Sequence, residues 1–217
     1  MLGLSAISDR DAPLKLLCLG AHCDDIEIGC GGTLLSLQDR FAISHIRAEV
    51  FASTPLRQRE TEKAMADLMT NSDLLDLNIH TFKDAFLRES WAEIKERFET
   101  IKAEFQPDII FTHYRGDLHQ DHSLISNLTW NTFRNHLILE YEIPKFDGDL
   151  GRPNLFVPLT DQQAERKVNT ILTAYESQSG KHWFEAETFT ALMRLRGLEC
   201  GGDQRYAEAF YMRKGQL

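Results

Sequence analysis

A short segment near the start of the chain constrains its fold more than any other feature. Residues 14–20 (LKLLCLG) form an apolar run that stops at a glycine. Such a run is typical of a strand buried on both faces of a parallel sheet. A polar turn, AHCDDIE, follows, and the next residues, GCGGTLLSLQDRF, place Leu34, Leu35 and Leu37 at helical spacing. A strand, a polar turn and a glycine-rich helix start together form the opening of a βα unit.

The rest of the chain continues this alternation of strand and helix patterns. Residues 43–52 and 108–113 (DIIFTH) have the pattern of strands, and residues 91–105 carry apolar side chains at spacings of three and four, which indicates an amphipathic helix. Further helices are expected after Pro55, from about 120 to 133, over 161 to about 175 and over 185–196, with a closing strand in the tail after residue 201. We therefore expect an α/β fold, a single Rossmann-like domain with a mostly parallel central sheet flanked by helices.

Charge and composition argue against several classes of protein. The chain has 33 acidic and 24 basic side chains among 217 residues, a formal net charge of −9. Nucleic acids and anionic membranes bind proteins through clusters of Lys and Arg, which this sequence lacks, so we expect neither as a partner. No stretch approaches the roughly 18 apolar residues of a membrane helix, and residues 1–13 lack the pattern of a secretion signal. The four cysteines do not make a disulfide framework. A cytoplasmic protein with reduced thiols is expected.

Two polar segments follow predicted strands, about 100 residues apart. His22-Cys23-Asp24-Asp25 comes directly after the strand at 14–20, and Asp117-Leu118-His119-Gln120-Asp121-His122 comes shortly after the strand at 108–113. In an open parallel sheet, ligands bind beyond the carboxyl ends of the strands. We therefore expect the two segments to converge at one end of the sheet.

The residue types in these segments fit a metal-dependent hydrolase. Two imidazoles and one carboxylate around an open position are a recurring ligand set for catalytic zinc, and His22, Asp25 and His122 could supply it. Asp24 would be free to accept the proton of a metal-activated water. Asp121 has the chemistry to hydrogen-bond His119 and favour its protonated form.

Each segment also has a simpler interpretation. Exposed Asp/His turns are commonly solvated loops, and either segment alone is weak evidence of function. Gly29, Gly31 and Gly32 are explained by tight helix–strand packing, although amides at a helix start could also hold an anion.

The motifs of this chain resemble those of a known family. AHCDDIEIGCGGTLL is similar to the AHPDDE…GCGGTL signature of the PIG-L/LmbE-like de-N-acetylases, and TH…GDLHQDH resembles its second signature, H-x3-D-x-H-x-D-H. RQRETEKAMADL is similar to a helix of the family that carries a substrate-contacting arginine, with Arg59, or else Arg57, in that position. RGLECGGDQRYAEAF resembles the ending of bacterial members, so the resemblance covers about residues 14–212.

The resemblance implies roles for individual residues. His22, Asp25 and His122 match the zinc ligands of the family, and Asp24 matches its general base. His119 matches the histidine that stabilises the oxyanion or protonates the leaving amine, with Asp121 orienting it. The implied reaction is hydrolysis of the acetamide of an N-acetylglucosamine unit in a small-molecule conjugate, with one Zn2+ per chain. This would make residues 14–140 a metal-site core and residues 141–217 the substrate side of a domain spanning 1–217.

The sequence departs from the family pattern at two positions. Cys23 replaces the usual proline, and a small packed side chain is the favoured interpretation over a metal-binding or oxidisable thiol. Asp117 stands where some relatives carry an oxyanion-stabilising tyrosine, and Tyr114 is the candidate substitute. Elsewhere, His113 ends a strand near the proposed site and could contact substrate or support the ligands, while Trp183 could line a substrate entrance.

Other functions stay open at this point. The same fold could serve as a catalytically inactive sugar- or nucleotide-sugar-binding module, although a complete ligand set argues against it. A nucleotide-dependent oxidoreductase is disfavoured because no G-x-G-x-x-G follows the first strand. A further alternative is a hydrolase that uses Cys23 as its nucleophile. Such an enzyme would keep its activity when a chelator removes divalent metal ions. A homo-oligomer is possible, but no feature of the sequence fixes the number of subunits.

Overall fold

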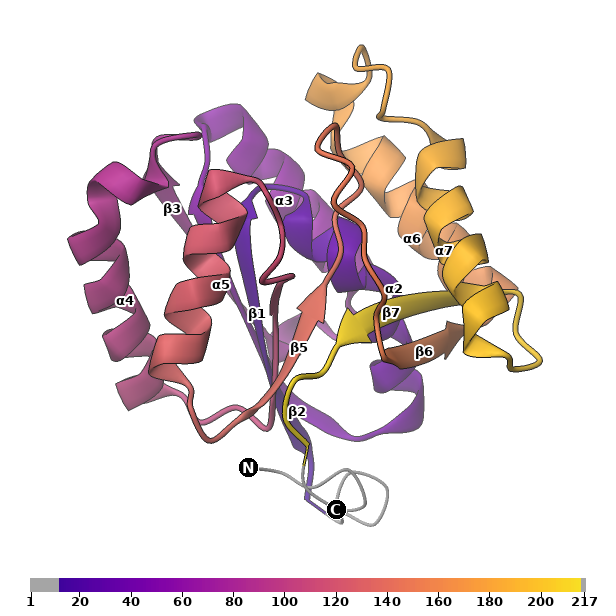
Figure 1. Cartoon of the computed structure of the whole chain (residues 1–217), viewed down its shortest axis with the longest axis horizontal. Helices are drawn as coiled ribbons and strands as arrows, with labels where there is room; N and C mark the ends of the chain where they lie inside the picture. Colours follow the sequence, from indigo (N-terminus) through magenta and orange to yellow (C-terminus); the bar gives the residue numbers. More distant parts are fainter. Residues whose placement is uncertain (1–11, 216–217) are drawn as a thin grey trace.

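The computed structural model describes residues 12–215. The expectation that residues 1–13 carry no secretion signal therefore rests mostly on residues outside the described part of the chain. Its strands are β1 (Leu14–His22), β2 (Ile43–Ala52), β3 (Leu75–Phe82), β4 (Ile109–His113), β5 (Leu137–Tyr141), β6 (Leu155–Leu159) and β7 (Tyr206–Tyr211). They form one seven-stranded sheet in the order β3-β2-β1-β4-β5-β7-β6 (Figure 1). The first five strands pair in parallel, and β7 runs antiparallel to β5 and β6. The expected single α/β domain with a mostly parallel sheet is confirmed.

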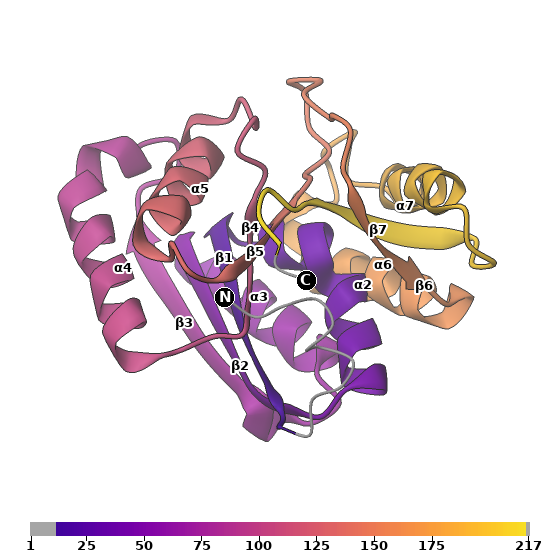
Figure 2. The same ribbon diagram turned by 60° about the horizontal axis from the view of Figure 1, so that its bottom comes forward.

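The helices cover both faces of this sheet. They are α2 (Asp25–Arg40), α3 (Pro55–Leu68), α4 (Trp91–Glu104), α5 (Gln120–Thr132), α6 (Asp161–Ala174) and α7 (Ala186–Cys200), with short 3-10 turns η1 (Ser72–Leu74), η2 (Leu87–Ser90) and η3 (Glu176–Gln178). α4 and α5 pack together on one face, while α2, α3 and α6 pack on the other with α7 beside α6 (Figures 1 and 2). Within residues 12–215, the helices are too short or too polar to cross a membrane.

The apolar run of β1 is explained by this two-sided cover. Leu16 and Cys18 belong to the core beneath α2, α3 and α6, whereas Leu17 and Leu19 belong to the core beneath α4 and α5. Because successive side chains of a strand point to opposite faces, a strand covered on both faces must be apolar at consecutive positions.

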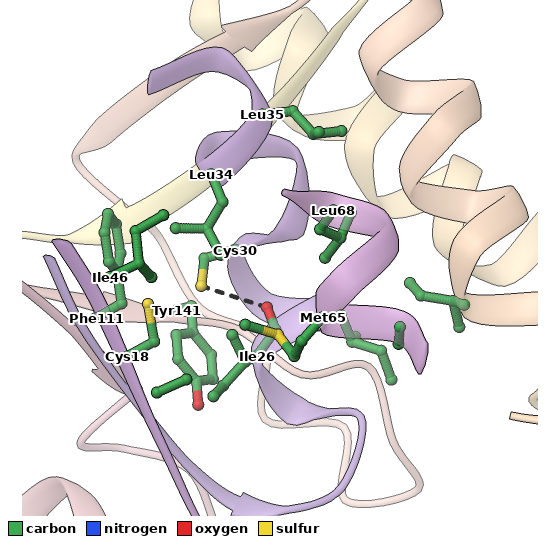
Figure 3. Close-up of a cluster of buried hydrophobic side chains, with 14 of the residues drawn as sticks. Cys18, Ile26, Cys30, Leu34, Leu35, Ile46, Met65, Leu68, Phe111 and Tyr141 are labelled. Carbon is green, nitrogen blue, oxygen red and sulfur yellow. Dashed lines mark hydrogen bonds between the residues drawn. The ribbon is translucent and has the colours of Figure 1, made fainter. Parts of the chain in front are cut away.

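The start of α2 is packed closely against the sheet. A Cβ added to Gly29 would lie 2.2 Å from the ring of Tyr141. That ring lies in the core shown in Figure 3, beside Ile26 and Cys18, and its hydroxyl donates a hydrogen bond to the carbonyl of Leu19 over 2.6 Å. Close packing thus explains Gly29, and it is the first of the two interpretations expected for these glycines.

Gly32 combines close packing with an anion contact. A Cβ added there would lie 2.5 Å from Leu159, and the backbone amides of Gly32 and Thr33 donate to the carboxylate of Glu208 at 2.9 and 2.6 Å. Glu208 also pairs with the buried ammonium of Lys167 at 2.6 Å. The anion held by the α2 amides is therefore a side chain of β7, which ties the closing strand to the first helix.

One strand differs from the sequence expectation. β5 covers residues 137–141 (LILEY), a stretch that the sequence analysis did not assign. All five residues are buried and the strand lies between β4 and β7. A five-residue segment with three consecutive apolar residues and no alternating pattern has no periodicity to distinguish a strand from a turn of buried helix.

Candidate metal centre and active site

The two polar segments meet where the strand order of the sheet reverses. After β1 the chain builds β2 and β3 on one side, and then crosses to place β4 on the other side of β1. The carboxyl ends of β1 and β4 therefore flank the switch point at which open α/β sheets bind ligands. His22 is the last residue of β1 and Asp25 the first of α2, while His119 caps the N-terminus of α5 and His122 lies in its first turn.

Three side chains from these segments converge on one point. Nδ1 of His22 lies 3.1 Å from Nε2 of His122. Carboxylate oxygens of Asp25 lie 3.5 Å from each of these nitrogens. Zinc holds nitrogen and oxygen ligands at about 2.0–2.2 Å, so two corners of its coordination tetrahedron lie about 3.3–3.5 Å apart. The three side chains predicted from sequence thus lie close to the spacing of ligands around one tetrahedral cation, with Asp25 offering a different oxygen to each histidine.

The outer nitrogens of both histidines face carboxylates. Nε2 of His22 lies 3.1 Å from Oδ2 of Asp121 and 3.1 Å from Oδ1 of Asp84, and Nδ1 of His122 lies 2.9 Å from Oδ2 of Asp117. When the outer nitrogens donate their protons to these carboxylates, the inner nitrogens carry lone pairs. The two inner nitrogens, 3.1 Å apart, share a hydrogen bond when His22 carries a proton there, and a cation between them can take the place of that proton. The donor set therefore fits a divalent cation.

Electrostatics at this point also favour positive charge. Burial lowers the pKa of His22, but Asp121, Asp25 and Asp84 outweigh it and raise that pKa well above the usual value. Burial raises the pKa of Asp25, but His122, His113 and His22 hold it well below its usual value, so Asp25 stays ionised.

Asp24 lies beside the three donors in a strained turn. Its backbone has φ 100° and ψ −20°, a left-handed conformation that is costly for a residue with a side chain. Nη2 of Arg57 donates to Oδ2 of Asp24 over 2.7 Å and also to the carbonyl of Cys23. Burial raises the pKa of Asp24 to about 6 against the opposing effect of Arg57. A carboxylate with such a pKa is suited to accept a proton near neutral pH.

The structure distinguishes between the two candidate arginines. Arg57 lines the pocket beside its hydrogen-bond partner Asp24, whereas Arg59 is exposed and is not among the residues that line it. Of the two, the pocket lining favours Arg57 as the arginine that contacts substrate, and this role stays a prediction. Two residues along a helix differ by about 200° in direction, so only one of the pair can face the site.

Asp121 differs from expectation in the residue it contacts. Its carboxylate faces His22 and accepts hydrogen bonds from the amides of Ala85 and Leu87 at 2.8 and 3.3 Å. His119 instead accepts at Nδ1 from the backbone amide of Asp121, over 3.3 Å, so its neutral form carries the proton on Nε2. Burial and then the charges of His122 and His22 lower the pKa of His119, where the sequence analysis expected Asp121 to favour its protonated form.

His113 supports the donors from behind. It is fully buried at the end of β4, its ring stacks on that of His122 with centroids 4.0 Å apart, and its Nε2 lies 3.2 Å from Oδ2 of Asp25. It is not among the residues that line the pocket, so of its two expected roles the geometry fits ligand support and not substrate contact.

A pocket of about 810 Å³ opens over this cluster. Asp24, His119 and Arg57 line it, and so does Trp183, as expected. Four charged residues that were not expected from the sequence also line it, namely Lys83, Asp84, Lys145 and Lys181. No motif marks them, because they come from the connections after β3, β5 and η3.

The two departures from the family pattern have structural explanations. Cys23 is buried with its thiol near the carbonyl of Ala52, and burial raises the pKa of Cys23 to about 11. A protonated, packed thiol is neither a metal ligand nor a nucleophile. Asp117 binds His122, and Tyr114 stacks on Tyr211 at 3.8 Å without lining the pocket, so Tyr114 is not a substitute for the missing tyrosine.

Comparisons with known proteins bear on the family and the fold of this chain. The model of the PIG-L family, described as GlcNAc-PI de-N-acetylase, matches residues 17–133. The conserved protein TT1542 from Thermus thermophilus superposes with a TM-score of 0.73 at 22% identity, covering 94% of this chain and 96% of its own. The N,N'-diacetylchitobiose deacetylase from Pyrococcus horikoshii has a TM-score of 0.69 at 20% identity, with 94% and 85% covered. A zinc-inhibited form of teicoplanin deacetylase has a TM-score of 0.70 at 14% identity, with 91% and 97% covered.

At these identities the superpositions establish the fold alone. The family match is stronger evidence, because it covers more than half of the chain and includes both polar segments that meet at the switch point. The chain therefore belongs to the PIG-L family.

Proposed function

We propose that this protein is a zinc-dependent hydrolase that removes the N-acetyl group from an N-acetylglucosamine-type amino-sugar conjugate. The observation that carries the proposal is the convergence of His22, Asp25 and His122, with donor atoms 3.1–3.5 Å apart, beside the pocket-lining Asp24. The family match and the chitobiose and teicoplanin deacetylases of the same fold support amide hydrolysis on an amino sugar.

The protein supplies the proton transfers of this reaction. His22, Asp25 and His122 would hold a divalent cation, which would supply Lewis acidity to lower the pKa of water and polarise a carbonyl oxygen. The carboxylate of Asp24 takes a proton from the water that attacks the amide carbon. His119, with its proton on Nε2, donates a hydrogen bond to the negative charge that develops on the carbonyl oxygen. As the C–N bond breaks, the nitrogen receives the proton that Asp24 took from water, and the carboxylic acid product loses its remaining proton and leaves as acetate.

The remaining residues position these groups and the substrate. Arg57 holds Asp24 in its strained turn through the two hydrogen bonds described above. Trp183 offers a ring face on which a sugar can stack. In this proposal residues 14–140 supply the metal donors, residues 141–217 supply the Trp183 side of the pocket, and the protein acts in the cytoplasm with its thiols reduced.

The test is amine release from a panel of N-acetylglucosamine conjugates by protein stripped of metal and reloaded with one equivalent of Zn2+. We expect release by the loaded protein only. Asp24→Asn should retain one zinc per chain by elemental analysis while losing at least a hundredfold in kcat. Asp203→Asn, an exposed carboxylate in the turn before β7, serves as the matched control and should behave as the wild type.

The runner-up is a catalytically inactive sugar-binding module of the same fold. Protein that binds an N-acetylated sugar but releases no amine from any conjugate, with its zinc site filled, would establish that function and reject the hydrolase. Full activity of Asp24→Asn would reject the assignment of the base.

A further inference from the structure

The guanidinium group of Arg57 is held by contacts of two kinds. Besides the hydrogen bonds that Nη2 donates to Asp24 and to the carbonyl of Cys23, Nη1 donates to Oε2 of Glu60 over 3.2 Å. The Cζ atom of Arg57 also lies over the ring of Tyr175, 4.7 Å from its centroid. A guanidinium can donate hydrogen bonds in its plane and contact an aromatic ring with its face at the same time. Glu60 and Tyr175 together therefore restrict the position of Arg57.

Glu60 joins Arg57 to a segment far along the chain. The two residues are three positions apart on α3, so their side chains share one face of the helix. Oε2 of Glu60 also accepts a hydrogen bond from the hydroxyl of Ser177 over 2.7 Å, and Oε1 accepts one from the backbone amide of Ser177 over 2.8 Å. Ser177 belongs to η3, which follows α6. The carboxylate that orients Arg57 is therefore itself oriented by η3.

Tyr175 comes from the same segment and contacts Arg57 with its ring. It lies between α6 and η3 and is fully buried. Its hydroxyl donates a hydrogen bond to Oε1 of Glu27 over 2.6 Å and lies 3.2 Å from Oγ1 of Thr61. Glu27 is in the first turn of α2, whereas Thr61 is in α3. Because the hydroxyl is anchored to both helices, the ring has a fixed position beside Arg57.

Glu60 and Tyr175 are buried, and neither is among the residues that line the pocket. They do not contact a bound substrate, so an effect on the reaction passes through Arg57, which does line the pocket. The residue that Arg57 holds needs such support. The backbone of Asp24 has φ 100°, and a strained conformation of this kind persists only where its surroundings hold it.

We propose that Glu60 and Tyr175 are positioning residues of the reaction: they fix Arg57, and Arg57 keeps the carboxylate of Asp24 in the orientation that accepts a proton from water. The segment 175–177, in the second half of the chain, thus helps to position a base that stands near its start. This inference rests on the proposed function and assigns to that function two residues that lie outside both polar segments.

Glu60→Gln removes the acceptor that faces Arg57 and leaves the contact with η3 possible. The oxygen of the new amide can accept from the backbone amide of Ser177, and the Ser177 hydroxyl can accept from its nitrogen. We expect kcat of the zinc-loaded protein to fall by about 10- to 100-fold, because a small displacement of a reacting group has an effect of that size. KM should stay within about twofold, because Glu60 does not contact substrate.

The matched control is Glu62→Gln. Glu62 is exposed on the same helix and is not among the residues that line the pocket, so this variant should keep the wild-type kcat. Glu60→Asp keeps the negative charge and should recover part of the loss. The affinity for zinc, measured by competition with a chromophoric chelator, should be the same in all three variants as in the wild type.

Two variants of Tyr175 test the ring contact. Tyr175→Leu removes the ring and should lower kcat by about tenfold or more, because the stacking contact with Arg57 is lost. Tyr175→Phe keeps the ring and should lose less activity than Tyr175→Leu. Both variants leave Glu27 without its donor, so kcat is compared at a temperature at which circular dichroism shows both to be folded. An equal loss in the two variants would reject the role of the ring.

A double substitution shows whether Glu60 acts through Arg57. In the background of Arg57→Met, Glu60→Gln should cause no further loss of kcat, because the group that it positions is absent. If the two losses multiply, Glu60 acts by another route and its assignment as a positioning residue for Arg57 is wrong.

The mobility of Arg57 gives a readout without turnover. The order parameter of its Nε–H bond, from 15N relaxation, should fall from about 0.8 in the wild type to below about 0.6 in Glu60→Gln. The signal is assigned by its absence in Arg57→Met. An Arg57 side chain that is equally rigid in both proteins, or an unchanged kcat in Glu60→Gln, would overturn the inference while amine release by the wild type retains the hydrolase. If the wild type releases no amine from any conjugate, the hydrolase is rejected, and a loss of order in Glu60→Gln would still establish that Glu60 holds Arg57.

Discussion

Oδ2 of Asp117 accepts a hydrogen bond from Nδ1 of His122 over 2.9 Å and a second from Nζ of Lys145, also over 2.9 Å. Burial raises the pKa of Asp117, but His122, His113 and Lys145 lower it to about 2, so the carboxylate stays ionised. Because Nδ1 of His122 donates its proton to this ionised carboxylate, Nε2 of the same ring carries a lone pair. That lone pair faces His22 and Asp25. A residue that stands in place of a tyrosine in some relatives thus sets the orientation of a proposed metal ligand.

Asp117→Asn should weaken zinc binding by about 10- to 100-fold, because loss of a carboxylate behind a ligating histidine typically has that effect. Competition with a chromophoric chelator measures the affinity directly, without reference to activity. Asp147→Asn, an exposed carboxylate in the connection between β5 and β6, is the control. Wild-type zinc affinity in Asp117→Asn would show that the contact does not orient His122.

Arg57→Met should lower kcat by at least tenfold, because the carboxylate of Asp24 and the carbonyl of Cys23 lose the donor that holds them in the strained turn. Arg59→Met, two residues further along α3 and exposed, should retain kcat within about twofold. Steady-state kinetics on the same amine-release assay compares them. A larger loss for Arg59→Met than for Arg57→Met would restore the original preference for Arg59.

Gly29→Ala should destabilise the protein by about 1–3 kcal/mol or more, because the new methyl group would lie 2.2 Å from the ring of Tyr141. Gly180→Ala, where an added Cβ meets nothing within 4 Å, should change the free energy of unfolding by less than about 0.5 kcal/mol. Urea denaturation followed by circular dichroism measures both. Equal stability of the two variants would contradict the proposed packing role of Gly29.

Glu208→Gln and Lys167→Met should each destabilise the protein by about 3–5 kcal/mol, because each leaves a buried charge without its partner. The double variant should be more stable than the sum of the two losses predicts, since no uncompensated charge remains. A double-mutant cycle by urea denaturation measures this coupling. Strict additivity would show that the pair does not interact in solution.

Much of the fold was predictable because its signals are local. The buried strand β1, the amphipathic helix α4 and the glycine-rich start of α2 each combine a periodic pattern with a clear beginning or end. β5 was not predictable in this way, because its five consecutive buried residues are explained by cover on both faces, and that cover comes from distant segments.

In the candidate site, too, some features were predictable from the sequence and others were not. Its proposed metal donors stand in two short segments whose residue types and positions after strands indicate a shared ligand, and the structure brings those donors together. The contacts around them were less predictable. Asp121 was expected to face His119, yet its carboxylate faces His22, because the path of the connection between β4 and α5 decides which side chains face each other.

The amino-acid sequence by itself therefore determined the alternation of strands and helices, the family, and the identity of the groups that can hold a cation and move a proton. These properties depend on residue type and on spacing within a few positions. Tertiary structure alone decided that Arg57 and not Arg59 reaches Asp24, that Asp117 holds His122, and that Lys83 and Lys181 share one pocket. Such relationships depend on the rotation of helices and the paths of connections, which are set when segments distant in sequence pack together.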